Sequence, residues 1–479
     1  MDNEVRQRIR RLYAVIIVAF LGLVGWQSYW QLAKSDWLLS QPGNRRLSRA
    51  ELAVPRGMIF DRAGQKLAWT EQKTRHYADG RATAAVLGYI DPRYGRTGVE
   101  GAWNLEMSGL SRTFTARDLH RILTGDPPGG NDLTLTLDLG LQQAAQAALA
   151  DHRGAIAVLD PDTGGILALA TNPTFDPASI RTDFPALASS DEGALRNRAT
   201  QDLYPPGSSM KVVVTSAALM HNFDPTTRYT CPGTSHIYQV TVTDFHGEHH
   251  GSIDMPQALA VSCNNYFARA AVAIGGEKFA ETTQAFGFNR PWWKALPDAR
   301  MLPLPLAEST IVPDITAHIP DGELAHMGFG QSTVVASPLQ MAMVAAAVAN
   351  HGTLMAPFLV KELRKSGGGP SLATFNSVPI GFPLSADAAD RVATMMRGVV
   401  THGTGTHANL PNLTVYGKTG TAQQSGGMDH AWFIGFATRE HAGVTGRIAF
   451  AALIERGGTG GVVAVPAARK VLEAWGEEE

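Results

Sequence analysis

The chain has 479 residues, of which 44% are hydrophobic and 18% are charged, and its formal net charge is −2. This composition excludes an intrinsically disordered chain, and the near-neutral charge excludes a global field that would recruit nucleic acid. The length allows one large domain with a smaller one beside it.

The N-terminus joins a basic run to an apolar stretch. Arg6–Arg11 reads RQRIRR, and Leu12–Trp30 reads LYAVIIVAFLGLVGWQSYW without a charge. Basic residues on one flank and aromatic residues on the other are typical of a membrane anchor, and no cleavage site of the signal-peptide type follows. We therefore expect a cytoplasmic N-terminus over 1–11, a membrane-spanning helix over 12–30 and an extracytoplasmic remainder, with a cleaved signal peptide as the alternative.

The next segment is polar and rich in turn residues. Val54–Trp69 (VPRGMIFDRAGQKLAW) predicts a strand, a turn at Arg62–Gly64 and a return strand, and Thr124–Asp132 (TGDPPGGND) has the composition of a linker. These features predict a compact domain over 35–130, followed by a larger domain over 131–479.

The larger domain begins with a short strand and an alanine-rich helix that starts near Leu139. A β-hairpin is predicted around DPDTGG, in residues 154–172. Helices are then predicted at Ser208–Met220, Pro256–Ile274 and Pro338–Ala349, and three late strands, in LTVYGKTGTAQQ, HAWFIGFAT and GRIAFAALIER, precede a closing helix near 466–476. Strands at both ends around a helical middle predict an α/β domain with an all-helical insertion.

Ser208 and Lys211 stand one turn apart at the start of a predicted helix, in YPPGSSMKVVV. A serine hydroxyl becomes a nucleophile when a neighbouring base takes its proton. A lysine can be that base if apolar surroundings or a second cation lower its pKa. An N-capping serine with a surface lysine gives the same pattern, so this motif alone is weak.

Two further motifs strengthen it. Ser262-Cys263-Asn264 is the only Ser-x-Asn of the chain, and Lys418-Thr419-Gly420 lies in a predicted strand, where the bare glycine could let a substrate lie against the backbone. Lys365-Ser366-Gly367 has the same form as the third motif, but it leads into Gly-Gly-Pro, which cannot lie in a central strand. We therefore reject it.

Together, and in this order, the three motifs resemble the signature of penicillin-binding proteins and serine β-lactamases. The segments YPPGSSMK, GSIDMPQALAVSCNNYF and GKTGTAQQ resemble the transpeptidase domain of class B penicillin-binding proteins, and RGMIFDRAGQKLA and GRTGVEGAWNLEMSGL resemble that class's pedestal. The resemblance covers essentially everything after the anchor. It implies a central antiparallel sheet flanked by helices, an all-helical subdomain and a small, mainly β pedestal, shorter here than in larger members.

The resemblance also implies the first half of a catalytic site. Ser208 would be the nucleophile that is acylated by the penultimate D-alanine of a peptidoglycan stem peptide, and Lys211 would be its base. Ser262 would relay a proton to the leaving amine, and Asn264 would hold Lys211 and the substrate amide.

The strand motif would supply the other half. Lys418 would provide positive potential, and Thr419 and Thr421, on either side of Gly420, would bind the carboxylate of the substrate or of a β-lactam. The backbone N–H groups of Ser208 and Thr421 would form the oxyanion hole. No cofactor is implied.

The same resemblance implies partners and a location. The expected partners are peptidoglycan stem peptides, β-lactams, the membrane and a SEDS-family glycan polymerase together with other cell-wall synthesis proteins. The expected location is the inner membrane, crossed once, with the catalytic domain outside the cytoplasm.

Three alternatives remain within reach of these motifs. A β-lactamase of class A needs a hydrolytic Glu-x-x-Leu-Asn, which does not follow Ser262-Cys263-Asn264. A D,D-carboxypeptidase uses the same residues, but the anchor and pedestal favour cross-linking. A non-catalytic β-lactam sensor usually adds several membrane spans and a His-Glu-x-x-His segment.

The polar cluster DFHGEHHG, Asp244–Gly251, raises the possibility of a metal site. It lacks His-Glu-x-x-His spacing, so we predict no metal. Cys231 and Cys263 are the only cysteines, and the sequence permits either a disulfide or two buried thiols.

Overall fold

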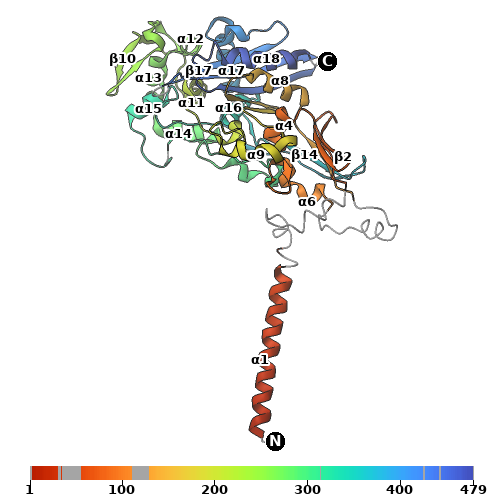
Figure 1. The fold of residues 1–479 in the computed structure, drawn as a ribbon. Coiled ribbons are helices and arrows are strands. Elements are labelled where there is room, and N and C mark those ends of the chain that lie inside the picture. Colours follow the sequence, from red (N-terminus) through yellow and green to blue (C-terminus); the bar gives the residue numbers. More distant parts are fainter. Residues whose placement is uncertain are drawn as a thin grey trace.

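The structure, a computed structural model, describes residues 3–30, 34, 55–109, 129–312, 314–423, 427–441 and 444–477, and all structural statements concern these residues. Helix α1 (Asn3–Ser28) stands apart from the body of the protein (Figure 1). Its segment Arg6–Ser28 contains an 18-residue window of mean hydropathy 1.8, none of it buried. The helix is therefore long and apolar enough to cross a membrane.

A six-stranded sheet lies on the side of the body nearest α1. The predicted hairpin is present as β1 and β2, with Ile59 paired to Ala68. The strand order of the six-stranded sheet is β15-β14-β6-β1-β2-β3. In the same order, the bounds are Ser371–Thr374, Val360–Arg364, Asp132–Leu135, Ile59–Phe60, Lys66–Glu71 and Thr74–Tyr77. The sheet thus combines strands from both sides of the expected boundary near residue 130, which remains a prediction.

A buried cluster of charged residues connects β3 and the segment before β1 to helix α5 (Gly98–Ala102). Glu100 is fully buried and contacts Arg56 Nη2 and Arg75 Nε, each at 2.6 Å. Burial opposes ionisation of Glu100, but the two guanidinium groups outweigh it and lower the pKa of the carboxyl. Removing one partner from such a cluster leaves an uncompensated buried charge, so the three residues hold their segments together.

The second sheet has five antiparallel strands in the order β17-β18-β19-β7-β8. Alternate residues of β7 face opposite layers: Ile156 and Val158 belong to the core that holds α8 and α18, whereas Ala155 and Ala157 belong to the core that holds α16. The bounds are β7 Gly154–Leu159, β8 Ile166–Asn172, β17 Thr414–Ala422, β18 His430–His441, β19 Val444–Ile454, α8 Leu139–Leu149, α16 Pro338–Ala349 and α18 Ala464–Glu477. The predicted α/β domain is confirmed, and β17 is one edge of its sheet.

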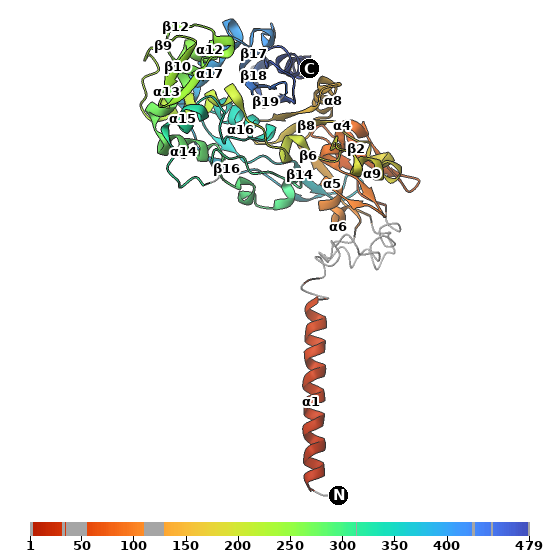
Figure 2. The same ribbon diagram turned by 60° about the vertical axis from the view of Figure 1, so that its left-hand side comes forward.

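A helical subdomain lies opposite the six-stranded sheet (Figure 2). Its helices and their neighbour α17 are η3 Gly207–Met210, α11 Lys211–Met220, α12 Met255–Val261, α13 Asn264–Ile274, α14 Gly276–Ala285, α15 Asp321–Met327 and α17 Ala386–His402. Shorter elements beside them are β9 Tyr229–Cys231, β10 Thr234–Ile237, β11 Val240–Thr243, β12 Gly251–Ile253, β13 Leu354–Met355 and β16 Pro379–Gly381. Elements near the first sheet include α4 Gly80–Leu87, α5 Gly98–Ala102, α6 Asn104–Met107 and α9 Ile180–Ser189, whereas α10 Arg198–Gln201 contacts β7 and β8 of the second sheet and α16.

The single helix predicted at Pro256–Ile274 is wrong. Ser262 has left-handed backbone angles, φ 62° and ψ 39°, and separates α12 from α13. Each half has its own N-cap, Asp254 in a capping box and Cys263 through its Sγ. The interruption turns the Ser262 carbonyl and hydroxyl toward the lysine of α11, which a continuous helix would not do.

Candidate active site

Ser208 lies in the short helix η3, where the chain passes close to strand β17. Gly207 has φ +52°, and a Cβ on it would lie 2.6 Å from the carbonyl oxygen of Thr421. The Trp432 indole donates to the Pro205 carbonyl at 3.0 Å and so fastens the segment before the serine to β18. Ser208 is partly exposed, and no described residue hydrogen bonds to its hydroxyl.

Lys211, at the start of α11, is fully buried. Its Nζ donates to the Ser262 carbonyl at 2.5 Å, to Asn264 Oδ1 at 2.7 Å and to Ser262 Oγ at 3.2 Å. Burial lowers the pKa of this amine to about 8, against the raising effect of nearby thiols and Asp244. An amine with such a pKa has an appreciable neutral fraction near neutral pH, as a general base requires.

Lys418 reaches the same hydroxyl from the other side. It is fully buried in β17, and its Nζ donates to Ser262 Oγ at 2.9 Å and to the Thr419 carbonyl at 2.8 Å. Burial, and secondly the charge of Lys211, lower its pKa well below the ordinary lysine value. The two amines therefore disfavour each other's protonation across one serine hydroxyl.

The remaining strand residues shape the edge of β17. The Thr419 hydroxyl lies 2.5 Å from that of Thr404, and Thr421 Oγ1 accepts from the Gly460 N–H at 3.4 Å. A Cβ on Gly420 would lie 2.9 Å from the Trp432 Cβ and 3.0 Å from the Pro206 carbonyl. The missing side chain thus lets η3 approach the strand, which differs from the sequence-based expectation that it makes room for a substrate.

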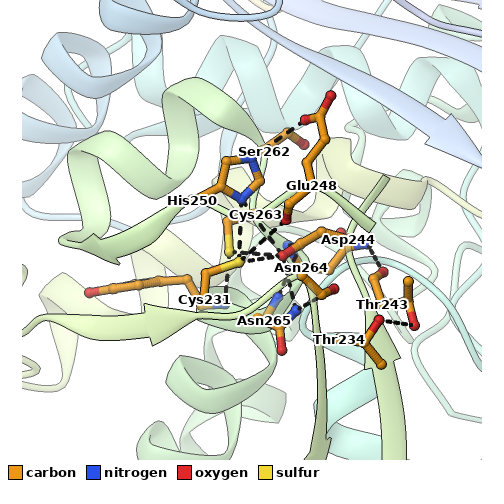
Figure 3. A network of polar contacts seen from close by, with 12 residues as sticks. Cys231, Thr234, Thr243, Asp244, Glu248, His250, Ser262, Cys263, Asn264 and Asn265 are labelled. Carbon is orange, nitrogen blue, oxygen red and sulfur yellow. Dashed lines mark hydrogen bonds and ion pairs between the residues drawn. The ribbon is translucent and has the colours of Figure 1, made fainter. Parts of the chain in front are cut away.

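Sequence reasoning missed the role of Asp244, which is almost completely buried beside α13 (Figure 3). Its Oδ1 accepts from the backbone N–H of Asn264 and, at 3.3 Å, of Asn265. Asn264 also donates through Nδ2 to the Thr243 carbonyl at 2.9 Å. Burial would raise the pKa of Asp244, but hydrogen bonds from Cys231 and the two asparagines, with the charge of Lys211, lower it. An ionised carboxylate therefore fixes Asn264.

A possible metal-binding cluster surrounds the same carboxylate. One ligand atom each of Cys231, Asp244, His250 and Cys263 lies within 4.8 Å of the others. Both cysteines are free and buried, which confirms the alternative of two thiols. Two cysteine sulfurs, an imidazole and a carboxylate form a donor set that fits tetrahedral Zn²⁺. The prediction of no metal relied on a single-segment spacing, whereas these ligands come from β9, the segment between β11 and β12, and the N-cap of α13.

The structure thus gathers the predicted residues from three segments. The Ser-x-x-Lys motif runs from η3 to the first residue of α11, and Ser-x-Asn lies at the junction of α12 and α13. Lys-Thr-Gly lies on β17. Hydrogen bonds join Lys211 to Ser262 and Asn264, and Lys418 to Ser262. Ser208 stands one helical turn before Lys211, whose amine belongs to this hydrogen-bonded array, and such an arrangement is suited to acyl transfer.

Comparisons with known proteins agree with this geometry. A family model described as the penicillin binding protein transpeptidase domain matches residues 154–473, and one described as the penicillin binding protein A dimerisation domain matches residues 56–133. The peptidoglycan D,D-transpeptidase PbpA of Mycolicibacterium smegmatis is 32% identical over 503 residues, covering 97% of this chain and 98% of the relative. The D,D-transpeptidase MrdA of Acinetobacter baumannii is 30% identical, covering 84% of this chain and 66% of the relative.

Solved structures give the same result. A ceftriaxone acyl-enzyme complex of penicillin-binding protein A from M. tuberculosis has a TM-score of 0.79 at 29% identity and covers 88% of this chain and 99% of its own. The D,D-transpeptidase domain of a peptidoglycan glycosyltransferase from Eggerthella lenta has a TM-score of 0.75 at 34% identity and covers 88% of this chain and 98% of its own. The similarity therefore extends far beyond the motif-bearing segments.

Proposed function

The chain belongs to the penicillin-binding proteins that carry a transpeptidase domain, and from this premise we propose that it cross-links peptidoglycan stem peptides through an acyl-enzyme on Ser208. The observation that carries the residue assignment is the Ser262 hydroxyl, which two buried lysine amines contact at 3.2 and 2.9 Å. A proton can pass along such an array without entering bulk water.

In the acylation step, neutral Lys211 takes the proton of Ser208, and Oγ attacks the carbonyl carbon of the penultimate D-alanine. The backbone N–H groups of Ser208 and Thr421 stabilise the resulting oxyanion. The peptide bond then breaks, and Ser262 passes a proton to the amine of the departing D-alanine. The products are an ester on Ser208 and free D-alanine.

Substrate recognition rests on β17 and on Asn264. Because β17 is an edge strand, its free side can pair with an extended stem peptide. Lys418, Thr419 and Thr421 would hold the terminal carboxylate, with Gly420 keeping the strand against η3, and Asn264 would hold Lys211 and the substrate amide. In the second step the amine of an acceptor stem attacks the ester, which forms the cross-link and frees Ser208. A β-lactam would acylate Ser208 by opening its own ring amide.

The membrane arrangement belongs to the same proposal. Residues 12–30 would anchor the chain in the inner membrane, 1–11 would lie in the cytoplasm, and the domains at 35–130 and 131–479 would lie outside it. The apolar, unburied α1 supports this arrangement. A SEDS-family glycan polymerase and other cell-wall synthesis proteins would act beside it, with α1 as a contact within the membrane.

Covalent labelling tests the proposed function. Penicillin should attach once per chain, and mass spectrometry of the digested protein should place the adduct on Ser208. Ser208→Ala should abolish labelling, whereas Ser209→Ala, which removes the buried hydrogen bond to the Pro206 carbonyl, should retain it. An adduct on Ser262 would assign the nucleophile elsewhere. With stem peptides, amide formation supports the transpeptidase, and hydrolysis alone would make the protein a carboxypeptidase.

A further inference from the structure

We propose that Glu455 is a positioning residue for acylation, because its carboxylate holds Tyr204 and thereby the segment that carries Ser208. This role rests on the proposed function, since it requires Ser208 to be the nucleophile. Glu455 belongs to none of the three motifs. It directly follows β19, which β18 separates from the strand of Lys418, so it acts on the reaction only through the residues that it holds.

The Glu455 carboxylate uses both of its oxygens. Oε1 accepts from the Tyr204 hydroxyl at 2.7 Å and from Arg198 Nε at 3.0 Å, whereas Oε2 contacts Arg153 Nε at 2.7 Å. The backbone N–H of Glu455 donates to the Arg153 carbonyl at 2.7 Å, which fixes the residue beside the start of β7. The side chain is 14% exposed. A carboxylate with charge-assisted contacts on both oxygens has little freedom to rotate.

Arg198 makes this ion pair difficult to replace. Its side chain is almost completely buried, and it donates through Nη1 to the Gly193 carbonyl at 3.0 Å and through Nη2 to the Glu192 carbonyl. These carbonyl groups satisfy its N–H groups, and the carboxylate of Glu455 compensates its charge. Removing one partner of a buried ion pair leaves an uncompensated charge. The burial of Arg198 therefore favours one placement of Glu455.

The Tyr204 phenol is the second group that Oε1 holds. Burial, and secondly the hydrogen bond to Glu455, raise the pKa of this phenol, so it stays a proton donor. Its oxygen lies 2.7 Å from Glu455 Oε1 but 3.4 Å from Asp202 Oδ2. The ring packs edge-on against His430 and Trp432, with centroids 5.3 and 6.3 Å away. Ring packing and the hydrogen bond together fix the Tyr204 side chain.

Two prolines and a glycine, residues 205–207, join Tyr204 to Ser208. Each proline ring fixes one backbone angle, so a displacement of Tyr204 is passed along the segment instead of being absorbed by rotation. The Trp432 indole holds the carbonyl of the first proline, and the N–H of the glycine donates to the Gly330 carbonyl at 3.0 Å. The place of Ser208 beside β17 therefore depends on where Tyr204 is held.

Acylation kinetics of Tyr204→Phe in the full chain test this positioning. The variant keeps the ring but loses the hydrogen bond to Glu455. The first-order rate of acylation by penicillin should fall about tenfold, less than the 10²-fold that a displacement of about 1 Å can cost. The dissociation constant of the initial complex should change little, because β17 is unaltered. A wild-type rate, or a loss confined to the dissociation constant, would overturn the proposal.

Tyr89→Phe is the matched control. Tyr89 is a buried tyrosine whose hydroxyl donates to the Tyr94 carbonyl at 3.4 Å, in a separate hydrophobic cluster. This variant also loses one tyrosine hydrogen bond, but it should acylate at the wild-type rate. Thermal unfolding of both variants measures any loss of stability separately from the rate. A control as slow as Tyr204→Phe would assign the effect to general destabilisation and overturn the positioning role.

A double-mutant cycle then tests whether Tyr204 and Glu455 act together. Glu455→Asp keeps the negative charge but withdraws the carboxylate by one methylene, so it should slow acylation about as much as Tyr204→Phe. The double variant should be no slower than the slower single variant, because both changes remove one contact. Rate losses that multiply would overturn the coupling. A wild-type adduct on a serine other than Ser208 would instead overturn the proposed function.

Discussion

The amines of two buried lysines, Lys211 and Lys418, both donate a hydrogen bond to the hydroxyl of Ser262. Ser208 and Lys211 are one turn apart, so their common face follows from helix geometry. The contacts of Lys211 and Lys418 with Ser262 depend on how α11, α13 and β17 pack, which no local pattern encodes. The motifs therefore predicted which residues assemble, and only the structure gives the distances.

The buried amine of Lys211 predicts the pH dependence of acylation. Burial lowers its pKa to about 8, and only the neutral amine above this pKa can accept the Ser208 proton. The rate of penicillin acylation should rise about tenfold per pH unit below pH 8 and level off above it. Stopped-flow measurement across this range checks the profile. Lys211→Arg should be nearly inactive throughout, because arginine stays protonated, and a flat wild-type profile would exclude Lys211 as the base.

Lys418 should act through its position as a preorganised hydrogen-bond donor beside the Ser262 hydroxyl. Lys418→Ala should slow penicillin acylation by on the order of 10²–10³, the effect of removing one preorganised electrostatic group. Lys365→Ala is the matched control, because Lys365 follows β14 in the turn before β15 and lies outside the site. Acylation rates of both variants, with circular dichroism to verify folding, make the comparison. If Lys365→Ala were the slower variant, the carboxylate site would have to be reassigned.

At the scale of elements, the interruption between α12 and α13 could not be predicted. Apolar residues at helical spacing continue from Met255 to Ile274 across Ser262, although the Ser-Cys-Asn-Asn run at the centre consists of weak helix formers. A left-handed non-glycine residue costs about 1–2 kcal/mol. The contacts of Ser262 with two lysines offset this cost, and they come from α11 and β17. A local pattern therefore favours one helix where tertiary contacts impose two.

The cluster of Cys231, Asp244, His250 and Cys263 could not be predicted from the sequence for a similar reason. Its members span residues 231–263, and the pairing of Cys231 with Gly251 across β9 and β12 brings the outer ligands together. A search for closely spaced histidines cannot detect such an arrangement. An aspartate, a histidine and two cysteines near the Ser-x-Asn motif were the available signal.

The close approach of β17 and η3 predicts the effect of a single methyl group. Gly420→Ala would place a Cβ 2.9 Å from the Trp432 Cβ and force the strand away from the Pro206 segment. Overpacking of this kind costs about 1–3 kcal/mol of stability, and displacement of the nucleophile should slow acylation by on the order of 10²-fold.

Gly427→Ala is the control, since the nearest heavy atom to its Cβ, Arg456 Nε, lies at 4.0 Å. Thermal unfolding and penicillin acylation of both variants should separate the two effects. Unchanged acylation in Gly420→Ala would mean that the distance between β17 and η3 does not control catalysis.

For the whole molecule, the anchor should determine where the protein is found. The full chain should sediment with membranes, because α1 exposes its apolar residues along its length. A truncated chain that begins at Ser35, a position outside the described residues, should be soluble and should still bind penicillin. Fractionation with fluorescent penicillin measures both. A mature N-terminus beyond Trp30 would instead identify residues 1–30 as a cleaved signal peptide.

The six-stranded sheet restricts how this architecture can be rearranged. Strand β6 lies between β1 and β14, so residues 59–77 and residues 360–374 belong to one sheet. Helices α11 to α16 separate the two ranges in the chain. A recombination event that replaced only β1, β2 and β3 would place a foreign strand beside β6. The hydrogen bonds between the native β1 and β6 would then be lost. In this chain, β1 and β14 must therefore both keep the backbone pairing that each makes with β6.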